Sequence, residues 1–276
     1  ILTGMGCSFY EWYPLAEKMR KTNRVILFHR PGLGLSETRR NEIRNTGAVV
    51  KELNDMMTQL EITEPVILVG HSYGGLCVQH FAKEYEEKIA GIVLVDSTSV
   101  DLKELDELNL PTLDQDDNDE QWMKRCDSYS FMDQETLRNT LQFSLTENQK
   151  QLPLHLQQLI IDFQTKPTMY QAMYSEIANW KKDAEKIKSL GDFPNIPLTV
   201  IGRDKEYNIT LGVLDGLPEW ELRVFEEKWE ELITRQGKLN KNSELIFASE
   251  STHQIHLDRP DVIIEALHNM RKAIPH

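Results

Sequence analysis

The most informative segment of this sequence is Val66-Ile-Leu-Val-Gly-His-Ser-Tyr-Gly-Gly75. Its first four residues are apolar, and a continuous apolar run of this length is typical of a strand buried on both faces of a parallel sheet. Gly70 and Gly74 flank Ser72, and an amphipathic segment follows at residues 76–85. The order of strand, Gly-x-Ser-x-Gly and helix predicts a sharp turn that holds the Ser72 hydroxyl above the edge of a sheet.

The alternation of strand and helix continues on both sides of this turn. Short apolar runs predict four further strands, at residues 24–29, 91–95, 197–201 and 244–248. Amphipathic patterns predict helices at residues 13–19, 43–60, 220–236 and 261–272. Strands and helices that alternate in this way form right-handed crossovers, so the sequence predicts a mostly parallel, doubly wound α/β sheet. Because the opening Ile-Leu-Thr-Gly resembles the end of a strand, we expect the first strands of the sheet to precede residue 1.

Residues 100–191 interrupt this rhythm. They contain no strand-like run, and acidic stretches alternate there with helix-like segments. These segments carry apolar side chains that are candidates for a pocket roof, among them Trp122, Phe131, Phe143, Phe163 and Met169. The pattern predicts a helical cap, or lid, inserted into a core domain formed by residues 1–99 and 192–276.

The amino-acid composition limits the kinds of molecule that this protein is expected to bind. The 276 residues include 44 acidic and 31 basic side chains, a formal charge of −13, with no visible basic patch, so binding to nucleic acid is not expected. No apolar run approaches the ~18 residues that span a membrane. Three scattered cysteines and the lack of a secretory signal favour the cytoplasm, and they predict neither a disulfide framework nor a metal site. We expect a small-molecule substrate and no cofactor, and the oligomeric state is left open.

A serine hydroxyl becomes a nucleophile only with a base, normally a histidine that a carboxylate orients. His253 follows the last predicted strand and precedes the last predicted helix, so it is the favoured base, with His256 in reserve. Two carboxylates follow predicted strands, Asp96 and Asp204. Asp204 is preferred because it lies farther along the chain toward His253, and Asp96 remains the alternative.

An acyl-transfer site also needs two amide donors for the oxyanion. The glycine-rich bend Thr3-Gly-Met-Gly-Cys7 follows the first strand fragment. The backbone N–H of Met5 is therefore expected to pair with that of Tyr73, which opens the helix after Ser72.

Three motifs together resemble those of the α/β-hydrolase superfamily. They are the turn at residues 70–75, the loop Arg30-Pro-Gly-Leu-Gly-Leu-Ser36, and the segment Thr252-His-Gln-Ile-His-Leu-Asp-Arg-Pro260. The resemblance implies an eight-stranded, mostly parallel sheet with a cap after the sixth strand, and hydrolysis of esters, lactones, amides, C–C bonds or epoxides without a cofactor. Thr3-Gly4 departs from the family's frequent His-Gly, and Ser72 excludes the chemistry of relatives that carry Asp at this turn.

The sequence thus predicts a serine hydrolase that cleaves an ester-like bond of a small, partly apolar molecule through an acyl-enzyme on Ser72. A non-catalytic small-molecule-binding protein on the same fold is one alternative. An acyltransferase or C–C hydrolase that uses the same three residues is another.

Overall fold

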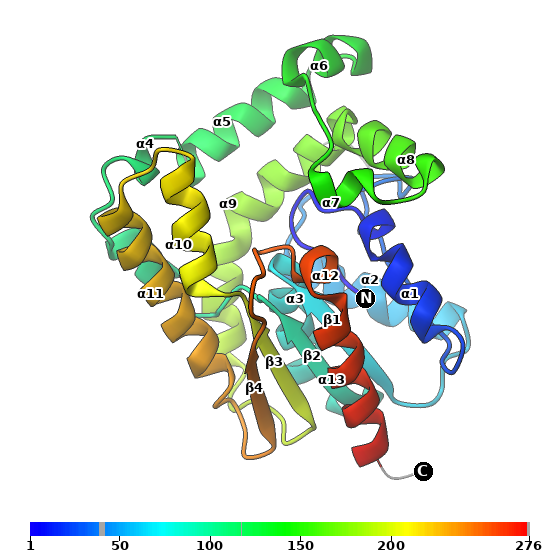
Figure 1. The fold of residues 1–276 in the computed structure, drawn as a ribbon. Coiled ribbons are helices and arrows are strands. Elements are labelled where there is room, and N and C mark those ends of the chain that lie inside the picture. The colour runs from blue at the N-terminus through cyan, green and yellow to red at the C-terminus, as the bar shows by residue number, and fades with distance from the viewer. Residues whose placement is uncertain (39–41, 117, 275–276) are drawn as a thin grey trace.

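A parallel sheet forms the centre of the molecule (Figure 1). The computed structural model describes residues 1–38, 42–116 and 118–274. Within them the sheet has the order β1-β2-β3-β4, with β1 at Val66–His71, β2 at Ile89–Val95, β3 at Leu198–Gly202 and β4 at Ser243–Phe247. Leu2 continues it beyond β1 through single parallel bridges to Gly70 and Phe28. The strand predicted at residues 24–29 is therefore present only as one bridge.

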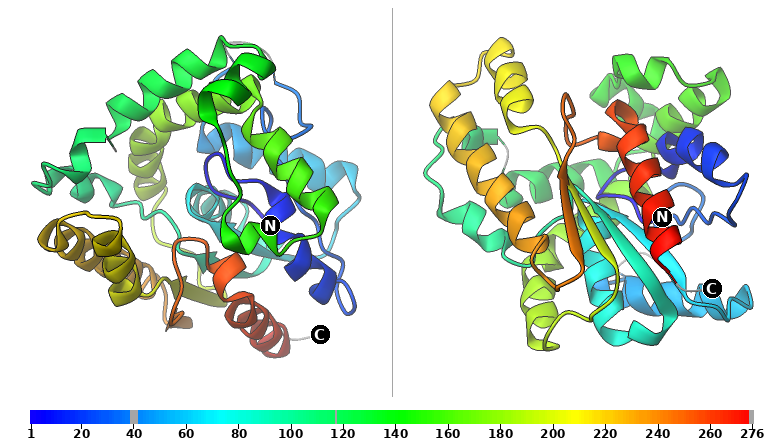
Figure 2. Two further views of the ribbon diagram at one scale, coloured as in Figure 1. Left: turned by 45° about the horizontal axis from the view of Figure 1, so that its top comes forward. Right: turned by 60° about the horizontal axis from the view of Figure 1, so that its bottom comes forward.

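Helices cover both faces of the sheet (Figure 2). Side chains alternate along each strand, so Leu68, Ile92 and Leu94 join one apolar cluster while Val69 and Val93 join the other. The first cluster includes side chains of α2 (Thr46–Gln59), α3 (Tyr73–Glu84) and α11 (Glu219–Gln236). The second includes side chains of α1 (Tyr13–Met19) and α13 (Pro260–Ala273). This arrangement confirms the doubly wound α/β fold.

Most helix ends lie close to the predicted ones, and local hydrogen bonds explain the shifts. α2 begins at Thr46 rather than residue 43 because the Asn45 side chain accepts a hydrogen bond from Ala48 N. α10 (Lys205–Leu214) was not predicted, and its N-cap is Asp204. The short α12 (Ile255–Asp258) and the 3₁₀ turns Phe9–Trp12 and Glu86–Lys88 complete this part of the chain.

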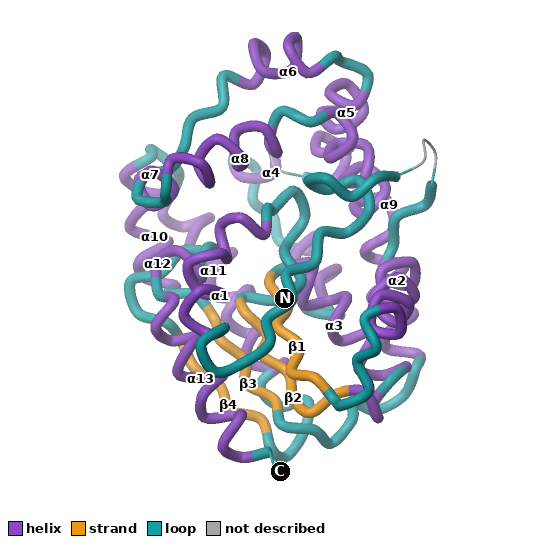
Figure 3. The backbone as a smooth tube through the Cα atoms, turned by 90° about the vertical axis from the view of Figure 1, so that its right-hand side faces the viewer, coloured by secondary structure: helices purple, strands orange, loops and turns teal. Residues whose placement is uncertain are grey.

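The described residues of the segment between β2 and β3 form helices joined by turns and loops, and none of them lies in a strand. It contains the 3₁₀ turn Leu102–Glu107 and the helices α4 (Leu113–Asp116), α5 (Asp119–Ser130), α6 (Gln134–Leu141), α7 (Glu147–Lys150), α8 (Leu154–Gln164) and α9 (Pro167–Ser189). Figure 3 shows α5, α6 and α8 at one end of the molecule, away from the strands. This segment is the expected cap, although its domain limits at residues 100 and 191 remain an interpretation.

The cap has an apolar cluster of its own, and α9 joins that cluster to the core. Phe163, Met169 and Met173 pack with Leu33 in the cap cluster, whereas Ile187 lies in the core cluster with α2 and α3. Among the other expected roof residues, Phe143 packs against a second, smaller apolar cluster formed by Leu152, Leu156 and Ile160. Trp122 and Phe131 are exposed. A cavity of about 790 Å³ lies between α6, α8 and the loop at Gly34 and Leu35. None of the helices described here is both long enough and apolar enough to cross a bilayer.

Candidate active site

The turn at Ser72 has the geometry that the sequence predicts. Ser72 has φ 52° and ψ −126°, a backbone conformation that L-residues rarely adopt. A Cβ on Gly70 would lie 2.6 Å from the Gly75 Cα, and one on Gly74 would lie 2.4 Å from the Leu2 carbonyl oxygen. Both glycines are therefore required by close backbone contacts around Ser72.

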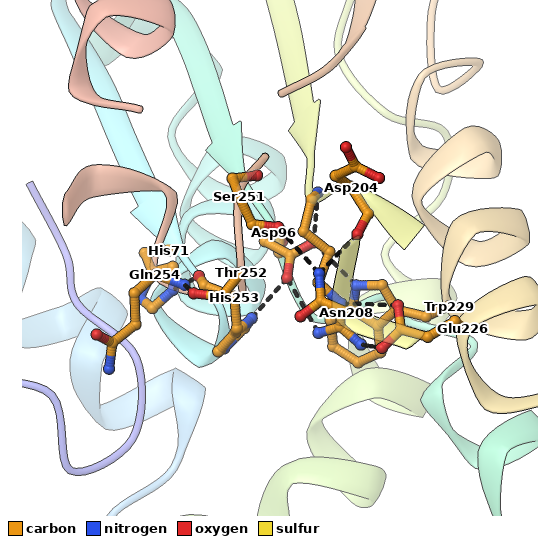
Figure 4. Close-up of polar contacts among 12 residues, drawn as sticks. His71, Asp96, Asp204, Asn208, Glu226, Trp229, Ser251, Thr252, His253 and Gln254 are labelled. Atoms are coloured by element: carbon orange, nitrogen blue, oxygen red, sulfur yellow. Dashed lines mark hydrogen bonds and ion pairs between the residues drawn. The ribbon is translucent and has the colours of Figure 1, made fainter. Parts of the chain in front are cut away.

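His253 lies in the loop between β4 and α12, beside this turn (Figure 4). Its Nδ1 is 2.6 Å from Oδ2 of Asp96. Its carbonyl oxygen accepts a hydrogen bond of 2.9 Å from Nε2 of His71, and the two imidazole rings are 4.7 Å apart. The structure therefore places the predicted base next to the residue that precedes Ser72.

Asp96 is a buried carboxylate held by several donors. It follows β2 with φ 39°, and its Oδ1 accepts hydrogen bonds from Trp229 Nε1 at 2.9 Å and Arg203 N at 3.3 Å. Its Oδ2 lies 3.2 Å from Nη1 of Arg203. Burial raises the pKa of Asp96, but the Arg203 charge and the hydrogen bonds from His253 and Trp229 outweigh burial and lower that pKa to about 2. The carboxylate is thus charged at neutral pH and holds Nδ1–H of His253.

The preference for Asp204 as the carboxylate that orients His253 is wrong in this structure. Asp204 Oδ1 accepts the Tyr207 N–H at 3.1 Å, and its Oδ2 accepts the Glu250 N–H at 2.9 Å. Its side chain caps α10 and the turn after β4 instead (Figure 4). Separation along the chain misled the prediction, because the His253 loop crosses above the end of β2 rather than that of β3.

Arg203 connects Asp96 to a second buried carboxylate on α11. Its Nε and Nη2 lie 3.0 and 2.7 Å from the two carboxylate oxygens of Glu226, and its guanidinium stands 4.6 Å from the centre of the Trp229 ring. The Arg203 cation thus lies between two carboxyl groups beside His253, and burial raises the pKa of Glu226. Glu226 and Trp229 were not predicted from the sequence. Their i, i+3 spacing indicates a shared face of a predicted helix, but it does not indicate what that face contacts.

His256, the reserve base, lies in the core. Its ring stacks on Trp12 with centroids 4.4 Å apart and an interplanar angle of 9°. It is 3% exposed, and neither ring nitrogen has a hydrogen-bond partner within the described part of the chain. Burial keeps the pKa of His256 well below its ordinary value, so this ring stays neutral and packs as an apolar group.

The loop expected to supply an oxyanion donor passes directly beside Ser72. A Cβ on Gly4 would lie 2.9 Å from the Ser72 Cβ. Tyr73 is the first residue of α3, where the unpaired N–H groups of a helix favour negative charge. Among the residues that the structure describes, the amides of Met5 and Tyr73 donate no hydrogen bond to the protein. Both are thus available to an oxygen bound near Ser72.

Comparison with known proteins identifies the fold. A family model described as alpha/beta hydrolase fold matches residues 1–129. The structure of a thermophilic esterase from Thermogutta terrifontis superposes with a TM-score of 0.67 at 15% identity, covering 99% of this chain and 89% of that chain. The chain has the α/β-hydrolase fold.

Two similar proteins differ in how much of this chain they match. It is 21% identical over 268 residues to YqjL of Bacillus subtilis (strain 168), covering 97% of this chain and 80% of that protein. It is 33% identical over 85 residues to methylesterase 10 of Arabidopsis thaliana, covering 30% of this chain and 31% of that protein. No group of three or more His, Cys, Asp or Glu side chains among the described residues is arranged to hold a metal ion.

Proposed function

We propose that this protein is a serine hydrolase that cleaves an ester-like acyl bond of a small, partly apolar molecule through an acyl-enzyme on Ser72. The observation that carries the proposal is the contact of His253 Nδ1 with the charged Asp96 carboxylate, 2.6 Å away, beside the strained turn of Ser72. The names of two similar proteins, an esterase and a methylesterase, support this reaction class.

The contact between His253 and Asp96 defines which nitrogen acts as the base. Because Nδ1–H donates to Asp96, Nε2 of His253 carries the free lone pair. Ser72 Oγ attacks the carbonyl carbon while Nε2 takes its proton, and the negative oxygen receives hydrogen bonds from the amides of Met5 and Tyr73. His253 then protonates the leaving alcohol as its bond to the acyl carbon breaks. Water repeats the sequence and releases the acid.

The surroundings of the loop favour a partly apolar substrate. A Cβ on Gly6 would lie 2.6 Å from the Met173 sulfur, so the cap covers this loop with a thioether side chain. Met5 also packs against the cap cluster that contains Phe163 and Met169. A substrate held between Ser72 and the cap therefore meets apolar surface on one side.

A fluorophosphonate probe tests the nucleophile. We expect covalent labelling of the wild-type protein, loss of labelling in Ser72→Ala, and unchanged labelling in Ser130→Ala, which alters a serine at the exposed end of α5. Stopped-flow measurement with a p-nitrophenyl ester adds the kinetic signature, a burst of p-nitrophenol as the acyl-enzyme forms.

The same experiment separates the alternatives. Saturable binding of the ester with no burst and no labelling overturns hydrolysis and favours a small-molecule-binding protein. A burst whose acyl group passes to an added alcohol or thiol faster than to water favours an acyltransferase.

A further inference from the structure

Arg30 is a fully buried cation that joins the cap to the loop beside Ser72. Its Nε lies 2.7 Å and its Nη2 lies 3.1 Å from the two carboxylate oxygens of Glu176 on α9. Its Nη1 donates to the carbonyl oxygen of Thr3 at 2.5 Å, and Nη2 donates to that of Gly4 at 3.1 Å. Both side chains of the ion pair are 0% exposed. One guanidinium therefore contacts the cap and two successive peptide groups of the loop.

The bond to the Gly4 carbonyl fixes the direction of a neighbouring amide. A trans peptide is planar, and its C=O and N–H point in opposite directions. The Gly4 carbonyl belongs to the same peptide unit as the Met5 N–H, so the donor that holds this oxygen also aims the Met5 N–H away from Arg30. The Cys7 N–H donates to the same carbonyl oxygen at 3.3 Å. Two donors thus set the plane of the Gly4–Met5 peptide, directly beside the Ser72 Cβ.

The cation that sets this plane is permanently charged. Burial alone would lower the pKa of Arg30, but the Glu176 carboxylate raises it above its ordinary value. Charge-assisted hydrogen bonds are roughly twice as strong as neutral ones, and they polarise the peptide so that its N–H end becomes more positive. The ring of Tyr73 lies under the guanidinium at 5.2 Å, so the residue that supplies the second amide packs against the same side chain.

We propose that Arg30 is a positioning residue, which orients the Gly4–Met5 peptide so that the Met5 N–H stabilises the oxyanion, and that Glu176 makes this orientation depend on the cap. The inference rests on the proposed acyl transfer at Ser72. It assigns a role in that chemistry to two residues that touch no reacting atom, and it makes α9 part of the machinery that assembles the site.

The ratio of kcat/KM for an oxygen ester to that for the matching thionoester tests this role. An oxyanion hole favours a carbonyl oxygen over sulfur, which is larger and a weaker hydrogen-bond acceptor. Removing one oxyanion donor costs about 10²–10³-fold in kcat in a well-studied protease. In Arg30→Met/Glu176→Leu we expect kcat for the oxygen ester to fall about 10²-fold, KM to change less than about threefold, and the ratio to fall with kcat. The double replacement leaves no unpaired buried charge, so we expect the fold to be retained.

A second ion pair, between the buried Arg44 and the partly exposed Glu52, provides the matched control. Arg44 makes two bonds of 2.6 Å to Glu52 and is 1% exposed, but it has no contact with the loop at residues 3–7. Arg44→Met/Glu52→Leu should keep the ratio of the wild type. If kcat/KM falls equally for the oxygen ester and the thionoester in the Arg30 variant, so that the ratio is unchanged, the positioning role is overturned.

Hydrogen exchange gives a readout that does not depend on turnover. The Cys7 amide, which donates to the Gly4 carbonyl, should exchange at least tenfold faster in Arg30→Met/Glu176→Leu than in the wild type or in the Arg44 variant. Unchanged exchange overturns the inference even in an active enzyme. Faster exchange in a protein that shows no burst and no labelling rejects the proposed hydrolase while keeping the link between cap and loop.

Discussion

Nδ1 of His253 lies 2.6 Å from Oδ2 of Asp96, although 157 positions separate them in sequence. The contact arises because β2 is adjacent to β1, so the carboxyl ends of both strands meet at one edge of the sheet. Asp96 follows β2 there, Ser72 follows β1, and the loop after β4 brings His253 to Asp96 and to His71, which precedes Ser72. The parallel order of the strands thus assembles three distant parts of the chain at one point.

Replacing Asp96 by Asn should abolish most of the activity. The amide of Asn carries no negative charge to orient Nδ1–H of His253. In a serine protease, the corresponding replacement lowers kcat by ~10⁴-fold because the imidazole takes the wrong tautomer. We expect kcat/KM for a p-nitrophenyl ester to fall by about 10³–10⁴-fold. Asp204→Asn provides the control, because Asn is a good N-cap for α10, and its kcat/KM should stay within about threefold. A comparable loss in both variants would contradict the assignment of Asp96.

The hydrogen bond from His71 to the His253 carbonyl should contribute to turnover by holding the His253 loop in place. His71→Phe keeps a buried ring but removes the 2.9 Å bond. Since displacement of a catalytic group by ~1 Å can cost about 10²-fold, we expect a loss of about 10- to 100-fold in kcat with little change in KM. Steady-state kinetics with circular dichroism to verify the fold measure this effect. Unaltered kcat would show that other contacts suffice to place the loop.

Acid should destabilise the protein through its buried histidines. Burial lowers the pKa values of His29 and His71 to about 3, and that of His256 well below its ordinary value. Below pH 6.5 the unfolded chain takes up protons at these residues while the folded protein does not, so the free energy of unfolding falls as the pH falls. Each such histidine contributes a slope of about 1.4 kcal/mol per pH unit until the pH reaches its folded pKa.

His256→Phe isolates one of these histidines. The phenyl ring preserves the stack on Trp12, and no hydrogen bond is lost because neither nitrogen has a partner among the described residues. Urea unfolding at pH 7.5 should give similar stabilities for both proteins. At pH 5 the variant should be more stable by about 2 kcal/mol, which is one proton over 1.5 pH units. Parallel loss of stability in the two proteins would mean that His256 becomes protonated in the folded state.

Two glycines in helices should respond oppositely to alanine. A Cβ on Gly74 would meet backbone oxygens of Leu2 and Thr3 at 2.4 and 2.6 Å, so Gly74→Ala should destabilise the protein by about 3 kcal/mol. A Cβ on Gly47, near the start of α2, meets nothing closer than 3.5 Å. Gly47→Ala should therefore stabilise it by about 0.4–1 kcal/mol, since alanine restricts the unfolded chain. Thermal melts of the two variants check the difference in sign.

The fold could be predicted from short runs of apolar residues in the sequence. Continuous apolar runs placed β1, β2 and β3, because a strand buried on both faces must be largely apolar. A similar run placed β4, although this strand lies at the edge of the sheet and is partly exposed. The fifth run, at residues 24–29, has the same composition but makes only the bridge from Phe28 to Leu2. Pairing between strands depends on their neighbours, which composition does not describe.

Site residues could be predicted where the neighbouring sequence determines their position. They could not be predicted where their position depends on the path of a distant loop. The turn of Ser72 follows from its own glycines, and His253 was found because the base follows the last strand in this chain order. Asp96 and Asp204 both follow strands, so the sequence did not distinguish them. Arg203 and Glu226 pair across β3 and α11, and Arg30 and Glu176 pair across the loop and the cap, contacts that no spacing in the sequence reveals.

α9 also limits how far the cap can move relative to the sheet. Its 23 residues form a rod about 34 Å long, rooted beside the sheet at Ile187 and embedded in the cap at Met173. Because one continuous helix belongs to both the cap and the core, it opposes rotation of the whole cap as a rigid body. Rotation of the whole cap would have to bend α9 or pull Ile187 out of the core cluster, so we expect the cap to keep its orientation on the sheet.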